Sequence, residues 1–252
     1  MKELLKINKL SKKYHTMKGE IEAVKDFSFA AGNSSFIAIV GPSGCGKSTI
    51  LSILCGIEKK SGGKIYFGKK DITIGYMLQN DTLLPWLSVL DNALLGLKIQ
   101  GNLTKETKKR TIELIKTYGL GDFIHCYPNE LSGGMRQRVA LIRTLAIDPD
   151  ILLLDEAFSS LDYQTRLEVS NDVYQIIKKE NKTTIMVTHD IGEAISMADT
   201  VIVLSKRPAQ IKNVYNIELN EDELPSSKRT HKDFNRYYKM IWEDLDINVW
   251  GT

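Results

Sequence analysis

The feature that most constrains this chain is a glycine-rich segment that directly follows an apolar run. The segment reads Gly41-Pro42-Ser43-Gly44-Cys45-Gly46-Lys47-Ser48, with Thr49 next, and the run reads Phe36-Ile37-Ala38-Ile39-Val40. This order goes beyond a glycine-rich turn before a core helix, because it matches G-x-x-x-x-G-K-[ST], the pattern of a phosphate-binding loop. Glycines let backbone amides curl around phosphate oxygens, and the helix that follows directs its positive end at them. We therefore expect the residues from Gly41 to Thr49 to bind a nucleotide, with a charge from Lys47 and a Mg²⁺-binding hydroxyl from Ser48.

The composition is that of an ordinary globular chain. It has 252 residues, 42% hydrophobic and 26% charged, which suits one large domain or a core with a subdomain. No stretch approaches about 18 consecutive apolar residues and the first residues lack a signal-peptide core, so we expect the chain to stay in the cytoplasm. A net charge of +3 is too small to indicate nucleic-acid binding. The three cysteines lack the spacing of a metal site and indicate a reducing compartment.

Hydrophobic periodicity predicts an α/β core with a helical insertion. The expected strands are residues 4–7, 23–29, 36–40, 64–67, 75–78, 151–154, 183–187 and 201–204. The expected helices are residues 88–98, 104–118, 134–146, 163–179 and 192–198, with Thr104 and Ser132 as possible caps. Strand patterns are missing between residues 83 and 146, so this part is predicted to be an inserted helical subdomain.

Two acidic residues follow the apolar run Ile151-Leu152-Leu153-Leu154, where a buried parallel strand would present ligand-binding groups. Asp155 can hold Mg²⁺ through water. Glu156 points to the other side of the chain and is placed to polarise a water that attacks a γ-phosphate. Two acids at a strand end are often only a solvated turn, but a phosphate loop upstream gives this pair a chemical use.

A third segment, Leu131-Ser132-Gly133-Gly134-Met135-Arg136-Gln137-Arg138, opens an expected helix. A hydroxyl and several free amides gather there at a positive helix end, which predicts a second phosphate-binding site at Ser132, Gly133 and Gly134. One chain with a single phosphate loop has no internal use for this site, whereas two copies arranged head to tail can complete each other's sites. The chain resembles the ATP-binding cassette (ABC) ATPases, whose signature sequence is LSGGQ and whose nucleotides are held between two such subunits. The resemblance covers roughly residues 4–210.

The resemblance implies a fold and a domain plan. The fold would be a P-loop NTPase (RecA-like) core with an inserted α-helical subdomain and a small antiparallel β region. Residues 1–220 would form the nucleotide-binding domain, with the helical subdomain at about 83–147, and residues 221–252 a linker and an amphipathic helical tail. The tail has one apolar face, which packs back on the core or docks a partner. Its residues are Phe234, Tyr237, Tyr238, Ile241, Trp242 and Leu245.

The resemblance also implies roles for single residues in binding ATP and Mg²⁺. Tyr14 would stack on adenine, although a buried strand-edge tyrosine is the alternative. Gln79 would sense Mg²⁺ and the attacking water, and the metal ligands would be Ser48, Gln79 and Asp155. Asp162 lies in a loop that crosses the dimer interface, and it could equally cap the next helix. His189 would contact the γ-phosphate, where a lone histidine would otherwise be structural.

One position departs from the family's usual signature, and two stretches resemble one branch of the family. Met135 stands where glutamine is commoner in the signature, so a side-chain hydrogen bond from this position is in doubt. The stretch over residues 79–92, which contains Leu83-Leu84-Pro85-Trp86, looks like that of nitrate, sulfonate and taurine importers. The stretch over residues 204–211, which contains Arg207-Pro208, looks like theirs as well. Core packing by Trp86 and a plain turn at Arg207-Pro208 are the structural alternatives.

The sequence thus predicts the ATP-hydrolysing subunit of a bacterial ABC importer at the cytoplasmic face of the membrane. Its expected partners are a second copy of itself, two membrane-spanning permease subunits and, indirectly, a solute-binding protein. A soluble cassette ATPase that acts on nucleic acid or ribosomes is the alternative, but the chain has one cassette, no basic face and no heptads. Sulfonate, taurine, nitrate and thiamine-precursor pyrimidines all remain open as solutes, because this subunit does not touch the solute.

Overall fold

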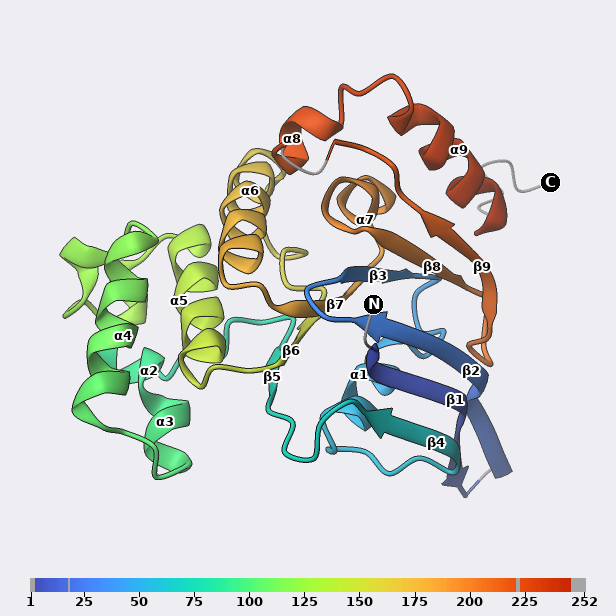
Figure 1. The fold of residues 1–252 in the computed structure, drawn as a ribbon, viewed down its shortest axis with the longest axis horizontal. Coiled ribbons are helices and arrows are strands. Elements are labelled where there is room, and N and C mark those ends of the chain that lie inside the picture. The colour runs from blue at the N-terminus through green and yellow to red at the C-terminus, as the bar shows by residue number, and fades with distance from the viewer. Residues whose placement is uncertain (1–2, 18, 221–222, 246–252) are drawn as a thin grey trace. The chain divides into compact units, whose positions relative to one another are not determined.

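The computed structural model describes residues 3–17, 19–220 and 223–245 of a chain that divides into two compact units. The first unit consists of Met1–Asp71 and Thr183–Thr252, and the second of Ile72–Lys182. Figure 1 traces the chain through its helices and strands. Residues 1–2, 221–222 and 246–252, which belong to the expected start, linker and tail, lie outside the described residues. The domain boundary at residue 220 and the limits of the helical subdomain stay predictions.

The first unit contains a small antiparallel sheet with the strand order β2-β1-β4. Its strands are β1 (Glu3–Thr16), β2 (Gly19–Gly32) and β4 (Gly62–Phe67). In β1 the buried residues Leu5 and Ile7 are two positions apart, so they share the face that packs on the core. Each of the three strands overlaps an expected one, and β1 continues well beyond residue 7 because it stays paired with β2 as far as Thr16.

The first unit also carries the strand before the phosphate loop. Its strands are β3 (Phe36–Val40), β7 (Thr183–Thr188), β8 (Thr200–Leu204) and β9 (Ile211–Asn216), in the order β7-β3-β8-β9. β3 runs parallel to β7 and β8, and every residue of β3 and β7 is buried, as expected for strands covered on both faces. The antiparallel edge strand β9 was not predicted, because its residues are half-buried or exposed and give no apolar run.

The helices of the first unit are α1 (Lys47–Leu54), α7 (Ile191–Met197), α8 (Pro225–Lys228) and α9 (Phe234–Asp244). α9 buries Phe234, Tyr237 and Ile241, which lie three and four positions apart on one face. The helix contacts α7 and β9, so the tail packs on the core, the first of its two predicted roles (Figure 1). Part of the expected linker is also packed, because Pro225 and Lys228 of α8 are buried.

The second unit combines a parallel strand pair with helices. The strands are β5 (Ile74–Met77) and β6 (Ile151–Asp155). The helices are α2 (Val89–Ala93), α3 (Leu95–Ile99), α4 (Lys105–Thr117), α5 (Gly133–Ala146) and α6 (Tyr163–Lys179), with short 3₁₀ turns at Gly121–Phe123 and Pro128–Glu130. Both predicted caps are present, because Thr104 accepts a hydrogen bond from the Thr107 amide and Ser132 from the Met135 amide.

The predicted helix over residues 88–98 is confirmed except for one interruption. It is divided at Leu94 into α2 and α3, and Ser88 caps its start. Gly96 lies inside α3, two residues after the interruption. The glycine is needed for packing, since a Cβ at this position would lie 2.7 Å from Cγ2 of Ile147.

The predicted fold class is confirmed: an α/β P-loop core with parallel strands, a helical segment and a small antiparallel sheet. Among the described residues, no helix combines the length and the hydropathy that a membrane span requires.

Candidate nucleotide site

The phosphate loop joins the end of β3 to the start of α1 in the first unit. Gly44 and Gly46 have φ angles of +69° and +128°, which L side chains rarely adopt, so the two glycines allow the tight curve of the loop. Gly46 is also the N-cap of α1 and offers no side chain to the first helical amides. An anion is the natural partner for amides at such a helix start.

The Lys47 side chain folds back over this loop. Lys47 is only 5% exposed, and its Nζ donates hydrogen bonds to the carbonyl oxygens of Gly41 (2.9 Å) and Pro42 (3.1 Å). A buried ammonium group needs such acceptors, and the loop carbonyls supply them. Ser43 and Ser48 are exposed, so their hydroxyls lie at the surface of the loop.

His189 directly follows β7, the strand beside β3. Val40 pairs with Thr188 in the parallel register, so Gly41 and His189 leave the sheet at the same edge. His189 is exposed, and the next residue, Asp190, caps α7 by accepting a hydrogen bond from the Glu193 amide at 2.9 Å. The first unit therefore brings the predicted histidine and the phosphate loop to neighbouring strand ends.

Tyr14 lies on β1 and is half-buried, so part of its ring is open to a ligand. The Nζ of Lys12 lies 4.6 Å from the centre of the Tyr14 ring, a cation–π distance. Lys12 also forms an ion pair with Glu58 at 2.7 Å. Sequence reasoning missed Lys12, although its place two residues before Tyr14 puts both side chains on one face of the strand.

In the second unit, Asp155 and Glu156 stand at the end of β6. Asp155 is buried and accepts a 2.8 Å hydrogen bond from the hydroxyl of Tyr76, a residue of β5 that the sequence did not single out. Glu156 has a φ of +45°, an uncommon backbone conformation for a residue with a side chain. Strain of this kind is concentrated at functional sites, where the surrounding structure enforces it.

Gln79 is the neighbour of Glu156 in this unit. Its Nε2 lies 3.5 Å from Oε2 of Glu156 and 3.3 Å from Oγ of Ser159. The register of β5 and β6 explains this contact. Met77 pairs with Leu154, and Gln79 and Glu156 each lie two residues after one member of that pair. The structure thus brings together the two side chains predicted to handle the attacking water.

The second predicted phosphate site lies at the start of α5. Ser132 is exposed and caps the helix, and Gly133 is half-buried. Gly134 is buried, and a Cβ there would lie 3.0 Å from Val169 Cγ2 and 3.2 Å from Thr165 Cγ2, both on α6. Gly134 therefore has a packing role, because it lets α5 approach α6 closely.

Asp162 caps α6, the second of the two roles that its position predicted. Its carboxylate accepts a hydrogen bond from the Thr165 amide at 3.1 Å. Hydrogen bonds from the Thr165 side chain and, to a smaller extent, from the Thr165 amide lower the pKa of this exposed carboxyl below its ordinary value. The group is therefore charged at neutral pH.

Two arginines of α5 hold the segment after Gln79, and the sequence analysis did not find them. Arg136 pairs with Asp81 at 3.0 Å. Arg143 donates to the carbonyl oxygens of Asp81 (2.7 Å) and Thr82 (2.9 Å), and Thr82 has a φ of +46°. The sequence could have indicated this pair, because Arg136 and Arg143 are seven residues apart and therefore lie on one face of the helix.

Comparison with known proteins decides the family of the chain. The family described as ABC transporter matches residues 24–159. The chain belongs to the ABC transporter family. It is 44% identical to the uncharacterized ABC transporter ATP-binding protein YtlC of Bacillus subtilis, over 96% of this chain and 95% of that protein.

Import proteins and solved cassettes are also among its relatives. The aliphatic sulfonates import ATP-binding protein SsuB of Bacillus cereus is 35% identical, over 95% of each chain. The dimeric structure of the cassette MJ0796 has a TM-score of 0.72 and 30% identity, over 86% of this chain and 100% of that one. The same cassette is known in a post-hydrolysis state bound to ADP and Pi. The chain is therefore an ATPase of the nitrate, sulfonate and taurine branch.

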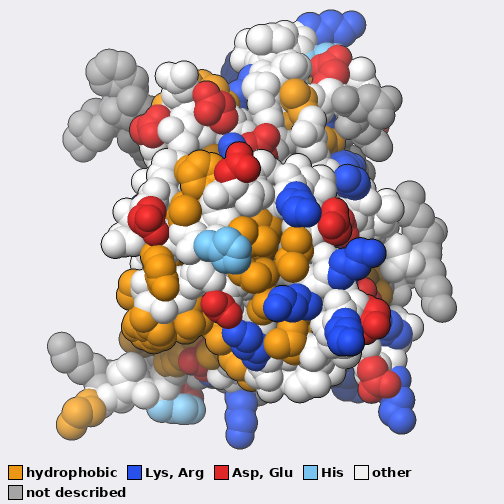
Figure 2. Space-filling view, turned by 90° about the vertical axis from the view of Figure 1, so that its left-hand side faces the viewer, with side chains coloured by type: hydrophobic (Ala, Val, Ile, Leu, Met, Phe, Trp, Pro, Cys, Tyr) orange, Lys and Arg blue, Asp and Glu red, His pale blue; other side chains and the backbone are white. Residues whose placement is uncertain are grey.

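The loop that contains Leu84, Pro85 and Trp86 is held in place by Asn92. Asn92 is fully buried, and its side chain bonds to the backbone of Leu84, Leu87 and Ser88. Trp86, in the same loop, is 70% exposed, so the core-packing alternative for this residue is wrong. Figure 2 shows hydrophobic side chains exposed among lysines and arginines on one face.

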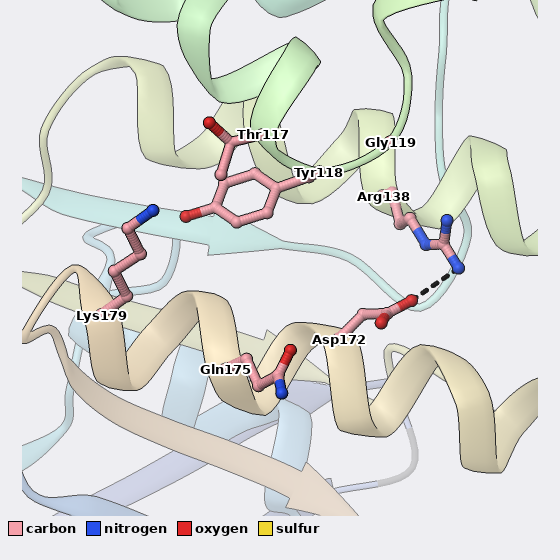
Figure 3. Close-up of a pocket in the computed structure, with 7 residues that line it drawn as sticks. All are labelled: Thr117, Tyr118, Gly119, Arg138, Asp172, Gln175 and Lys179. Carbon is pink, nitrogen blue, oxygen red and sulfur yellow. Dashed lines mark ion pairs between the residues drawn. The ribbon is translucent and has the colours of Figure 1, made fainter.

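A cavity of about 420 Å³ lies elsewhere in the second unit, between the end of α4 and α6 (Figure 3). Arg138 and Asp172 form an ion pair at one side of it. The nearby Tyr118 hydroxyl lies 3.4 Å from Glu180, and burial, with the charge of Glu180, raises the pKa of Tyr118 to about 12. None of the predicted nucleotide-binding residues lines this cavity.

Proposed function

We propose that this chain is the ATP-hydrolysing subunit of a bacterial importer and works as a head-to-tail homodimer beneath two membrane-spanning subunits. The main support for ATP hydrolysis is the contact between Gln79 and Glu156, together with the φ of +45° at Glu156. A carboxylate and an amide side by side can orient and deprotonate one water molecule.

The proposed nucleotide-binding residues run from Gly41 to Thr49. Lys47 would leave its contacts with the loop carbonyls and move to the β- and γ-phosphates, because an ammonium group binds phosphate more strongly than neutral oxygens. Tyr14 is proposed to stack on the adenine ring, and His189 to contact the γ-phosphate. The positions of Gly41 and His189 at one sheet edge support the last assignment.

The proposed Mg²⁺ ligands are Ser48, Gln79 and Asp155. Their hydroxyl, amide and carboxylate oxygens are the hard donors that Mg²⁺ prefers, and Mg²⁺ commonly takes few protein ligands and several from phosphates and water. The buried Asp155, oriented by Tyr76, fits such a site. When bound, the ion would supply positive charge to the phosphates, while Glu156 takes the proton of the attacking water.

The proposed dimer completes each site with residues of the other copy. Ser132, Gly133 and Gly134 at the start of α5, together with Asp162, would face the phosphate loop of the partner. Ser132 is exposed at a helix N-terminus, where the helix dipole favours negative charge. The related cassette MJ0796 has a dimeric structure, which supports a dimer of this chain.

The proposed membrane partners dock at the loop that contains Trp86. A tryptophan that is 70% exposed fits a groove on a partner, and aromatic residues dominate such contacts. The proposed solutes are small anions or zwitterions of the sulfonate, nitrate or taurine class, selected by a separate solute-binding protein. The subunit would then lie at the cytoplasmic face of the membrane.

The substitution Glu156→Gln tests the assignment of the base. We expect it to reduce the rate of ATP hydrolysis by about 10² or more, because an amide cannot accept the proton, while ATP binding persists and the ATP-bound dimer accumulates. Lys47→Ala is the contrasting variant and should lose ATP binding instead. Steady-state hydrolysis, equilibrium binding and gel filtration with ATP measure the three properties. Near-normal hydrolysis by the Glu156→Gln protein refutes the role of Glu156.

A further inference from the structure

The turn between β8 and β9 lies against the back of the phosphate loop. A Cβ added at Gly41 would lie 3.0 Å from Leu204 Cβ, and one added at Gly46 would lie 3.2 Å from Ala209 Cβ. A Cβ at Gly44 would lie 3.5 Å from Nη2 of Arg207. Three glycines of the loop therefore each face a different residue of the segment from Leu204 to Ala209.

This turn is itself well ordered by hydrogen bonds. Ser205 donates through Oγ to the Pro208 carbonyl at 2.9 Å, and the same oxygen accepts from the Gln210 amide at 3.1 Å. Ala209 is bonded to the backbone of β2, because its amide donates to Ala23 at 2.9 Å and its carbonyl accepts from Lys25 at 3.0 Å. The turn is therefore a fixed support within the first unit.

Arg207 connects the support to the loop. Its Nε and Nη2 both donate to the carbonyl oxygen of Gly44, at 3.1 Å and 2.6 Å. The C=O and N–H of a trans peptide point in opposite directions, so holding the Gly44 carbonyl also orients the Cys45 amide. That amide donates to the Pro42 carbonyl at 3.2 Å, and the Pro42 oxygen accepts from Lys47 at 3.1 Å. The charge of Arg207 at one end of this series of hydrogen bonds polarises the bonds and strengthens them.

We propose that Arg207 is a positioning residue that holds the phosphate loop in its binding-ready shape before nucleotide arrives. The inference rests on the proposed role of the loop in binding ATP. Pre-ordering a loop lowers the entropy that binding must spend on ordering it. Without Arg207, the Gly44–Cys45 peptide samples other orientations, and the nucleotide must order it on binding. Affinity falls, while the residues that handle the attacking water are untouched.

The test compares Arg207→Ala with Lys206→Ala, which removes the same charge from the same turn. Lys206 is exposed, and no hydrogen bond joins its side chain to the loop among the described contacts. We expect Arg207→Ala to raise the Kd of Mg-ATP and of Mg-ADP about fivefold, as for one exposed charge-assisted hydrogen bond. The KM for ATP should rise similarly while kcat stays within about twofold. Arg207→Lys, which keeps one donor, should lie between wild type and Arg207→Ala.

The outcomes separate this inference from the proposed function. If Lys47→Ala loses ATP binding and Arg207→Ala binds like Lys206→Ala, the role of Arg207 is refuted and that of the loop stands. If Lys47→Ala binds ATP normally, the proposed role of the loop fails first. A fall in kcat without a change in KM also overturns the inference. Should Arg207→Ala fail to fold, Arg207→Lys decides, because normal affinity in that variant contradicts a requirement for both donors.

Discussion

Replacing Asn92 by alanine should destabilise the subunit far more than replacing the larger Trp86 in the same loop. Asn92 accepts from the Leu84 amide at 2.8 Å and donates to the Leu87 carbonyl at 2.9 Å. It donates also to the carbonyls of Leu84 and Ser88, but those oxygens keep backbone donors at 3.1 Å and 2.8 Å. Alanine therefore deprives two backbone groups of the partner that Asn92 supplies.

The expected cost follows from that count. An unpaired buried donor or acceptor costs about 1–3 kcal/mol, so two such groups in a half-buried loop should cost about 2–4 kcal/mol. A small domain is stable by only about 5–15 kcal/mol, which makes this loss easy to measure. Trp86 is 70% exposed, so Trp86→Ala should change the free energy of unfolding by no more than about 0.5 kcal/mol.

Urea unfolding of the isolated subunit, followed by circular dichroism, measures both variants under one set of conditions. A loss below about 1 kcal/mol for Asn92→Ala, or a larger loss for Trp86→Ala than for Asn92→Ala, refutes the reasoning from hydrogen bonds. Trp86→Ala then becomes a clean probe of docking. If the fold and the ATPase rate persist, a loss of transport reports the contact with the membrane subunits, and unaffected transport places that contact elsewhere.

Two further predictions concern the loop and the dimer. A heterodimer of one Lys47→Ala subunit and one Ser132→Arg subunit should contain at most one intact site. ATPase activity should therefore appear only when the two variants are mixed. Undiminished ATPase activity of a protein that sediments as a monomer at the assay concentration would exclude the composite site. Burial raises the pKa of the Cys45 thiol, and the charge of Lys47 only partly offsets this effect. In a Cys55→Ser, Cys126→Ser background, the rate of Cys45 alkylation should therefore begin to rise at a higher pH than the rate of a free thiol, and alkylation at neutral pH as fast as in the unfolded chain would contradict the raised pKa. Because the unfolded thiol loses its proton first, the folded state should lose stability as pH rises past the ordinary thiol pKa.

Some features of this protein could be predicted from the sequence because they are local. A phosphate loop requires a strand before it and a helix after it, and both are encoded within residues 36–54. The acidic pair after Leu154 and the cap at Ser132 are local in the same sense, because a strand end and a helix start each follow from a few neighbouring residues. Their order along the chain indicated the family before any contact was known.

Other features depend on residues far apart in the chain, which only the tertiary structure could join. Periodicity could not show that Trp86 is exposed, because its environment is set by the buried Asn92 and the backbone around it. Nor could it show that Gly134 is needed for the close approach of α5 to α6. The contact of Arg207 with Gly44 joins residues 163 positions apart. A pattern within one segment determines which face of that segment is apolar, but which distant side chain meets that face is decided only when the whole chain packs.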